Sequence, residues 1–456
     1  MDVYNTISKK KEKFEPLKTG LVTMYCCGPT VYDFVHIGNF RTFIFYDIAR
    51  RVLEYNGYKV KQVVNITDVD DKTIKGSRET NSTLKSYTET YTKYFLEDIK
   101  KLNIKPAELY PHATDNILEM AKIIKKLVKD GYAYAQEDGI YYSIKKFKDY
   151  GKLSGAVIDS EAIKIKKDEY SKENAADFAL WKAWSPEDGD VFWEHGLIKG
   201  RPGWHIECSA MSMKYLGETI DIHSGAVDLI FPHHENEMAQ SEAYTGKKFV
   251  RYWLHPEHLL VNGQKMSKSM NNFYTLRDLE GMGFDPLAFR MLVLDADYRS
   301  KLDFDLNKLK KYSETLKRAT ISFCAIPLLK ENEENADTSE IGRLLDGFSE
   351  SIGNDFDTHS ALVSFFGLVE LANQRIREKS ISVGYRDALE AAFERMDSVL
   401  GLLKRRDVPE DIKSLIEKRE TARKNNQWSE ADALRIEIKN KGFEVVDLEG
   451  VGPVLI

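Results

Sequence analysis

The apolar residues in the first third of the chain alternate between strand-like and helix-like spacing. Residues 21–25 form a short apolar run typical of a buried strand, and residues 58–66 form a second run rich in valine. Between them, apolar residues recur at helical spacing over 38–54, and Asn56-Gly57 ends that pattern. Strand, helix and strand within about forty residues predict a βαβ unit, and therefore a parallel sheet.

Residues 111–200 interrupt this rhythm. They contain a helical pattern over 116–129, a predicted β-hairpin over 132–144 and an irregular lysine-rich stretch over 145–167. We interpret the segment as an insertion in the α/β domain. The α/β pattern then resumes, with a helix after Glu207, a strand at 219–223, a helix beginning near Pro232 and a strand at 249–254.

The last third of the chain is helical in pattern. Beyond Asp305 we expect helices and no strands until about residue 400. A small module then follows, with two polar helices and a short strand over 443–446. The expected division is a Rossmann-type α/β domain over 1–110 and 201–303, the insertion over 111–200, an all-α bundle over 304–403 and a small C-terminal module over 404–456.

Composition limits the classes of protein that fit. A length of 456 residues is compatible with two to four domains at roughly 150 residues each. The net charge of −6 means that any contact with nucleic acid must use local basic surface. The first residues lack a signal-like apolar core, and no apolar run is long enough to span a bilayer, so we expect a cytoplasmic protein without membrane contact. The four cysteines are unevenly spaced, which fits a reducing compartment.

Two short motifs carry candidate chemistry. Lys265-Met266-Ser267-Lys268-Ser269 follows the turn dipeptide Asn262-Gly263, and such a loop can place ammonium charge on a triphosphate. The alternative is an ordinary lysine-rich surface loop. His36-Ile37-Gly38-Asn39 opens the first predicted helix, where free backbone N–H groups favour phosphate and Gly38 lets an adenine ring lie flat. Its alternative is a simple helix cap, but both motifs fall on the carboxyl edge of the predicted sheet.

These motifs resemble the two signatures of class I aminoacyl-tRNA synthetases. The match to cysteinyl-tRNA synthetase is more specific and covers essentially the whole chain. One departure is that Asn39 stands where the family usually has a second histidine, and it can donate hydrogen bonds but carry no charge. The segments that carry the specific match are Cys27–Asp33, Asn65–Asp68, Gly203–Ser209 and Phe231–Glu237.

A metal site follows from the same resemblance. Two thiolates, an imidazole and a carboxylate suit Zn²⁺. Spacing alone favours buried cysteines and surface histidines, and His234 competes with His233 for a place beside Glu237. The resemblance implies one Zn²⁺ held by Cys27, Cys208, His233 and Glu237, and leaves Cys26 and Cys324 structural.

The resemblance also implies a reaction. L-cysteine is activated by ATP, with Mg²⁺, to cysteinyl-adenylate and pyrophosphate, and is then transferred to the 3′-terminal adenosine of tRNA(Cys). Zinc is expected to select cysteine over serine through the thiolate. The implied catalytic residues are Lys265, Lys268, His36 and Asn39. The implied ATP site comprises His36, Gly38, Asn39, Lys265, Ser267 and Lys268. The implied cysteine site comprises Thr67, Trp204 and His223.

The C-terminal module is the expected RNA contact. Arg419, Arg423 and Trp428 offer guanidinium and stacking groups for unpaired bases, although a solvated pair of helices has the same composition. The acidic run at Asp68, Asp70 and Asp71 is expected to be a solvated loop. We expect a monomer. Two other functions are a ligase joining cysteine to an amino-sugar and an inactive paralogue that binds RNA.

Overall fold

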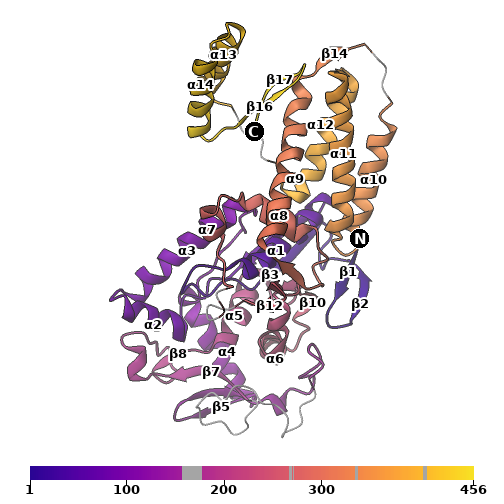
Figure 1. Cartoon of the computed structure of the whole chain (residues 1–456). Coiled ribbons are helices and arrows are strands. Elements are labelled where there is room, and N and C mark those ends of the chain that lie inside the picture. Colours follow the sequence, from indigo (N-terminus) through magenta and orange to yellow (C-terminus); the bar gives the residue numbers. More distant parts are fainter. Residues whose placement is uncertain (157–176, 267–269, 271, 334–336, 404–407) are drawn as a thin grey trace. The chain divides into compact units, whose positions relative to one another are not determined.

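Four parallel strands form the sheet that the apolar runs predict. They are β3 (Leu21–Cys26), β4 (Lys59–Val64), β9 (Ile220–Ser224) and β10 (Val250–Leu254), in the order β10-β9-β3-β4. The predicted Rossmann-type α/β class is confirmed. The structure is a computed structural model (Figure 1), and it describes residues 1–156, 177–266, 270, 272–333, 337–403 and 408–456.

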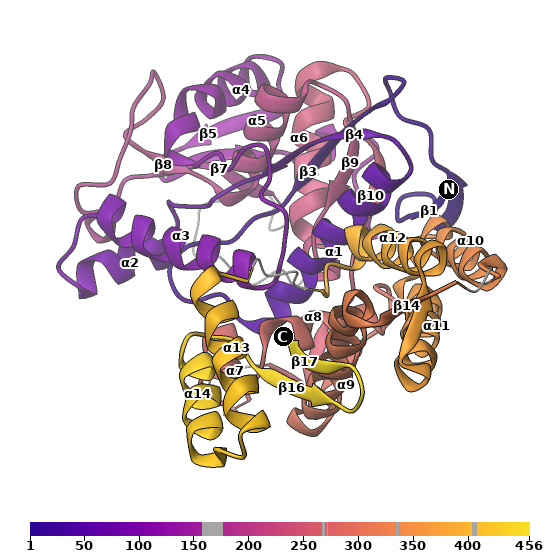
Figure 2. The same cartoon turned by 90° about the horizontal axis from the view of Figure 1, so that it is seen from above.

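Helices cover both faces of this sheet. Helix α1 (Ile37–Tyr55) connects β3 to β4, and α6 (Glu235–Thr245) lies between β9 and β10. Right-handed crossovers that leave the sheet centre in opposite directions place their helices on opposite faces. Figure 2 shows α1 on one side and α6, with α5 (Trp204–Leu216), on the other. The strand order therefore reverses between β3 and β9, with β4 added on one side and β10 on the other. Ligands bind at such a switch point in parallel sheets.

The insertion forms its own antiparallel sheet. Helix α4 (Ile117–Lys129) leads into the predicted hairpin, and the strand order is β5-β6-β7-β8. One continuous core joins this sheet to the parallel sheet, with Tyr25 and Trp253 from the latter and Ile140 and Leu180 from the insertion. Residues 157–167 of the lysine-rich stretch lie outside the described ranges. The four strands are β5 (Ala133–Gln136), β6 (Gly139–Tyr142), β7 (Phe178–Ala183) and β8 (Gly200–Pro202).

The chain divides into two compact units, residues 1–282 with 298–304 and residues 283–297 with 305–456. Residues 283–297 join the second unit because the apolar helix α8 (Pro286–Leu294) packs against α9 (Leu306–Ala325), although the sequence pattern places them with the α/β domain. The remaining elements of the first unit are β1 (Asp2–Asn5), β2 (Lys10–Lys13), α2 (Asp71–Glu79), α3 (Leu84–Lys101), β11 (Leu259–Val261), β12 (Gln264–Lys265), α7 (Leu276–Gly281) and β13 (Leu302–Phe304).

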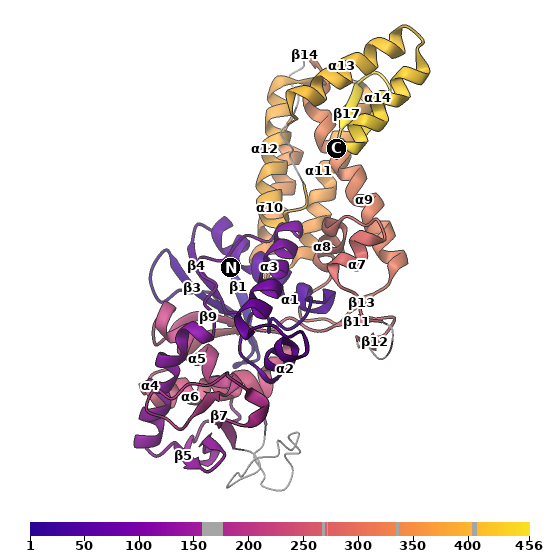
Figure 3. The same ribbon diagram turned by 90° about the vertical axis from the view of Figure 1, so that its left-hand side faces the viewer.

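The second unit is mainly a bundle of long helices (Figure 3). The prediction of no strands before residue 400 is wrong, because β14 (Lys330–Asn332) and β15 (Ser380–Ser382) pair in parallel. Strands of three residues are too short to show a period. The helices of the bundle are α8 (Pro286–Leu294), α9 (Leu306–Ala325), α10 (Ser339–Gly353), α11 (Thr358–Glu378) and α12 (Val383–Leu400).

The C-terminal module contains the two predicted helices and one strand more than predicted. Helices α13 (Glu410–Lys424) and α14 (Trp428–Asn440) pack together, and β16 (Val445–Leu448) pairs with β17 (Gly452–Leu455). Over the described parts of the chain, we find no helix with the length and apolar character needed to cross a membrane.

Candidate active site and metal centre

The loop after β3 is joined to the ends of the neighbouring strands. The backbone N–H of Cys27 donates to the carbonyl of Ser224 at 3.0 Å, and that of Thr67 donates to the carbonyl of Pro29 at 3.0 Å. Gly28 has no room for a side chain, because a Cβ atom there would lie 1.6 Å from the carbonyl oxygen of Asn65. The carboxyl edge of the sheet thereby brings Cys27 and Thr67 to one place.

Four buried side chains meet beside this loop and could hold a metal ion. Cys27, Cys208 of α5, His233 and Glu237 of α6 each offer one ligand atom, and these atoms lie within 4.8 Å of one another. His233 Nε2 lies 2.9 Å from Glu237 Oε1. Two thiols, an imidazole and a carboxylate are the donor set that zinc prefers, so these residues fit that ion.

A second set of residues overlaps the first. Cys27, His223, His234 and Glu237 also bring one ligand atom each within 4.8 Å of the others. His234 Nε2 lies 3.2 Å from Cys27 Sγ, and its Nδ1 lies 2.8 Å from His255 Nε2. The geometry therefore leaves the choice between His233 and His234 open, as the spacing does.

The charges within the cluster depend on one another. Burial opposes ionisation of Glu237, but the neighbouring His223 and His233 lower its pKa to about 2. Burial also opposes the charge on His233, but Glu237 and Cys208 raise its pKa to about 10. A hydrogen bond with Cys27 lowers the pKa of Cys208 to about 6, against the effect of burial, whereas burial raises the pKa of Cys27. These shifts favour a charged Glu237 and a charged His233, and a metal ion binds only the deprotonated imidazole, so metal binding would release the His233 proton.

A cavity of about 250 Å³ connects this cluster to the first signature. Trp204 stacks on His233 with ring centroids 4.1 Å apart, so the indole forms part of the wall beside the cluster. The predicted residues that line the cavity are Cys27, His36, Asn39, Thr67, Trp204, Cys208 and His233. Four other residues predicted for the ATP, cysteine and metal sites that the structure describes do not line it, namely Gly38, His223, Glu237 and Lys265. His223 is buried behind the cluster, where its Nε2 lies 2.8 Å from Glu237 Oε2.

His36 is the N-cap of α1. Its Nδ1 accepts a hydrogen bond of 3.3 Å from the backbone N–H of Asn39. Burial lowers the pKa of His36 to about 4, although the nearby Asp228 acts in the opposite direction. The imidazole is therefore neutral near pH 7, and its contribution in the unliganded protein is hydrogen bonding. The structure thus shows the helix cap, and the role of His36 in binding phosphate stays a prediction.

Lys265 projects from a hairpin. Strands β11 and β12 are joined by Asn262 and Gly263, both with positive φ, as the turn dipeptide predicts. Lys265 is exposed on β12. Ser267 and Lys268, the other predicted residues of this motif, lie outside the described residues.

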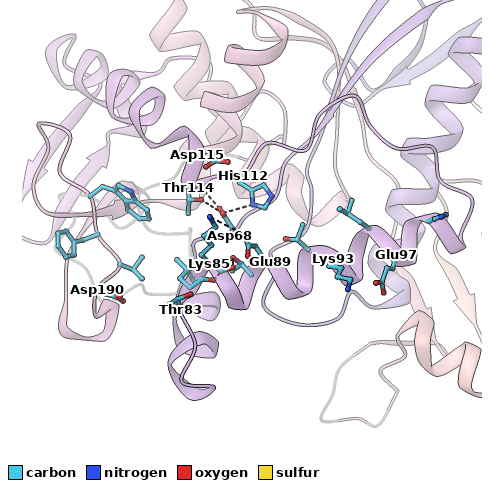
Figure 4. Close-up of a pocket in the computed structure, with 18 residues that line it drawn as sticks. Asp68, Thr83, Lys85, Glu89, Lys93, Glu97, His112, Thr114, Asp115 and Asp190 are labelled. Carbon is cyan, nitrogen blue, oxygen red and sulfur yellow. Dashed lines mark hydrogen bonds and ion pairs between the residues drawn. The ribbon is translucent and has the colours of Figure 1, made fainter.

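A larger groove of about 1030 Å³ is lined by Asp68, which follows the cavity residue Thr67 in the sequence (Figure 4). Asp68 accepts hydrogen bonds from the hydroxyl and the backbone N–H of Thr114, and His112 Nδ1 lies 3.1 Å from its carboxylate. The prediction of a solvated acidic loop is wrong for Asp68, which is only 5% exposed. Asp70 caps α2, and Asp71 pairs with Arg201.

The three predicted RNA contacts differ in exposure. Trp428 is 58% exposed at the start of α14, whereas Arg419 is 3% exposed. The Arg419 guanidinium donates two hydrogen bonds to the carboxylate of Asp447, at 2.9 and 2.6 Å. Arg423 is partly exposed and also pairs with Asp447, at 2.5 Å. Trp428 and Arg423 can therefore reach a ligand, while Arg419 braces the module.

Sequence reasoning missed two carboxyl groups of the site. Glu207 is buried and accepts a hydrogen bond of 2.9 Å from the Thr67 hydroxyl; burial, with the nearby Cys208, raises its pKa. Asp228 lines the same cavity as His36 and acts on it electrostatically. Glu207 stands beside Cys208 within a recognised motif, so the signal was available, whereas only the folded chain brings Asp228 to His36.

Comparison with known proteins places this arrangement in a family. The family model "tRNA synthetases class I (C) catalytic domain" matches residues 13–314, and the model "Cysteinyl-tRNA ligase anticodon binding domain" matches residues 405–450. The cysteine–tRNA ligase of Brachyspira hyodysenteriae is 44% identical, over 97% of each chain. That of Chlamydia muridarum is 45% identical, over 98% of this chain and 97% of the relative.

Solved structures resemble the fold at low sequence identity. Mycobacterium tuberculosis methionyl-tRNA synthetase in complex with methionyl-adenylate has a TM-score of 0.58 and 11% identity, over 84% of this chain and 90% of that one. The Agrobacterium radiobacter LeuRS–tRNA–LeuAMS complex has a TM-score of 0.60 and 9% identity, over 86% of this chain and 84% of that one. At these identities the likeness concerns the fold alone.

The parallel sheet, the cavity at its carboxyl edge and the catalytic-domain match together define a class I aminoacyl-tRNA synthetase, an ATP-dependent ligase. Within this class, one family is indicated by relatives at 44–45% identity over nearly the whole chain and by the match of the C-terminal module. The chain belongs to the cysteine–tRNA ligase family.

Proposed function

We propose that the chain activates L-cysteine with ATP and transfers it to the 3′-terminal adenosine of tRNA(Cys). The observation that carries the proposal is a single cavity lined both by His36 and Asn39 of the signature and by Cys27, Cys208 and His233 of the candidate metal site. A cavity of about 250 Å³ accommodates a small amino acid beside the reacting phosphate. The matched C-terminal module supports tRNA as the acceptor in place of an amino-sugar.

The chemistry requires positioning and charge stabilisation. The cysteine carboxylate attacks the α-phosphorus of ATP, and pyrophosphate leaves, with Mg²⁺ accompanying the phosphates. His36 donates a hydrogen bond from its neutral imidazole, and Asn39, exposed at the start of α1, offers an amide. Lys265 and Lys268 supply positive charge to the departing pyrophosphate. A ribose hydroxyl of tRNA then attacks the carbonyl of the adenylate, the acyl–phosphate bond breaks, and AMP leaves while the hydroxyl loses its proton.

Selection of cysteine is assigned to the metal cluster. The residues proposed to hold the ion are Cys27, Cys208, His233 and Glu237. When bound, Zn²⁺ would supply a soft acceptor that prefers a thiolate to a hydroxyl. Without it, a pocket distinguishes two such similar side chains by only about 10–200-fold. Measuring activation of cysteine and serine before and after zinc removal tests this role, and unchanged selectivity without zinc would contradict it.

Three further residues are assigned to the cysteine substrate and its site. Thr67 presents a hydroxyl whose orientation Glu207 holds, and Trp204 forms the wall beside His233. His223 lies behind the wall and is proposed to act through Glu237. Trp428 and Arg423 are proposed to contact unpaired bases of the tRNA, by stacking and by charge.

Cysteine-dependent ATP–pyrophosphate exchange, with a zinc determination on the same sample, is the direct test of the proposed function. Exchange with cysteine and about one zinc per chain is the expected result. Charging of tRNA(Cys) measured beside an amino-sugar acceptor then identifies the second substrate. Absence of cysteine-dependent exchange would favour an inactive paralogue. A monomeric state and a cytoplasmic location remain predictions.

A further inference from the structure

The segment after the lysine hairpin is attached directly to the His36 segment. The backbone N–H of Ile37 donates to the carbonyl of Tyr274 at 2.9 Å, and the ring of Phe273 meets the edge of His36 with centroids 5.3 Å apart. Thr275 then caps α7 by accepting from the N–H of Asp278. Any displacement of α7 is therefore transmitted to the end of the cavity where His36 lies.

Arg277 of α7 contacts aromatic rings from two other segments. Its guanidinium carbon lies 4.5 Å from the ring centroid of Tyr94 on α3 and 5.2 Å from that of Phe34. Phe34 lines the cavity two residues before His36 and stacks on Tyr94 with centroids 4.9 Å apart. Arg277 thus joins α3, α7 and the segment that leads into the signature.

The same guanidinium also pairs with the end of α3. Its Nη2 lies 2.9 Å from Glu97 Oε2 and 3.3 Å from Asp98 Oδ1. Asp98 is 1% exposed, and a buried carboxylate requires a nearby cation. Lys101 provides a weaker partner at 3.7 Å and is itself bonded to Glu280 of α7 at 2.7 Å. Glu97 lies at one end of the groove in Figure 4, so this contact forms part of its wall.

We propose that Arg277 is a positioning residue for the nucleotide end of the cavity. It holds α7 and Phe34 against α3, and it thereby keeps His36 where ATP binds. The inference rests on the proposed function, because it takes this end of the cavity as the ATP site. Lysine at this position would keep the charge for Asp98 but lose the planar contact with Phe34 and Tyr94.

Kinetics of cysteine-dependent ATP–pyrophosphate exchange test the proposal. We expect Arg277→Ala to raise the KM for ATP on the order of tenfold, the size of a lost cation–ring contact and ion pair, with the KM for cysteine and the zinc content unchanged. Tyr94→Leu should raise the KM for ATP by a similar factor, and Arg277→Lys should give a KM between those of Arg277→Ala and the wild type. Combining Arg277→Ala with Tyr94→Leu should raise the KM for ATP no further than Arg277→Ala alone.

Arg375→Ala is the matched control. Arg375 also lies over a tyrosine ring, that of Tyr385 at 5.0 Å, and pairs with Glu378, but it belongs to the helical unit. The KM for ATP should stay at the wild-type value in this variant.

Two results would overturn the inference: an unchanged KM for ATP in Arg277→Ala, or equal changes for ATP and cysteine together with lowered thermal stability. Absence of exchange in the wild type would instead refute the proposed function. The positioning role of Arg277 would then still be tested by equilibrium binding of ATP to the wild type and to Arg277→Ala.

Discussion

The candidate metal site (Cys27, Cys208, His233 and Glu237) and the hairpin that carries Lys265 are built in opposite ways. The cluster is buried and assembled from the loop after β3, from α5, from the segment before α6 and from α6 itself. The hairpin is one contiguous segment, and Lys265 on it is exposed. Discrimination between two similar side chains needs fixed donors in a dry site, whereas charge for a departing pyrophosphate must be reachable from solvent. We therefore expect selectivity and rate to respond to different substitutions.

The largest effect is expected at the cluster. Cys208→Ala removes one of the proposed ligands and leaves its partners buried, so zinc content should fall from about one per chain to near zero. Cysteine activation should fall on the order of 10³-fold or more, because a missing ligand costs more than the 10–100-fold of a lost outer contact. Metal analysis and exchange kinetics on the same sample measure both. Cys324→Ala in the helical unit is the control, and full zinc occupancy in Cys208→Ala would exclude this cluster as the metal site.

The Lys265–Ser269 sequence motif should affect the rate of activation without affecting the selectivity for cysteine. Lys268→Ala is expected to lower the exchange rate by roughly 10²-fold, comparable to the loss of one preorganised donor in an active site. The ratio of cysteine to serine activation should stay at its wild-type value. Lys310→Ala, an exposed lysine on α9, controls for the loss of surface charge. A near-normal rate, or a changed ratio, would break the separation between the two regions.

A substitution in the C-terminal module should leave both regions undisturbed. Trp428→Ala is expected to reduce kcat/KM for tRNA charging about tenfold, within the range for one lost base stack. Exchange should be unchanged, since that step needs no tRNA. Arg419→Ala is a useful contrast, because the buried pair with Asp447 predicts lower thermal stability. Normal charging by Trp428→Ala would remove this residue from the proposed interface.

The smallest effect is expected for the pH dependence of stability that the His112–Asp68 pair contributes, next to Thr67. The hydrogen bond to Asp68 raises the pKa of His112, although partial burial acts against it. A raised folded pKa means that the pair stabilises the fold fully below the unfolded value of about 6.5, and that this contribution is lost as pH rises through the folded pKa. The difference in unfolding free energy between wild type and His112→Gln should therefore shrink above neutral pH. Denaturation at several pH values measures it, and a constant difference would contradict the assignment.

Features that depend on residues close together in the chain are predicted correctly from the sequence. The βαβ unit followed from apolar spacing, and the turn at Asn262-Gly263 followed from its residues, because both depend on neighbours along the chain. The short strands β14 and β15 were not predicted, since three residues show no period and their pairing joins positions about fifty residues apart. Asp68 was misjudged because its partners, His112 and Thr114, lie in the insertion.

The sequence by itself determined the fold class, the family and the residue types available for chemistry, because motifs and spacing are local properties. Only the tertiary structure decided which of these residues meet. In the folded chain, one cavity is lined by His36 and by the cluster residues Cys27, Cys208 and His233, and His223 lies behind it against Glu237. Arg419 is buried against Asp447, and the Arg277 guanidinium lies over the ring of Phe34. The physical reason is that burial and pairing are set by segments distant in the chain, whose approach no local pattern records.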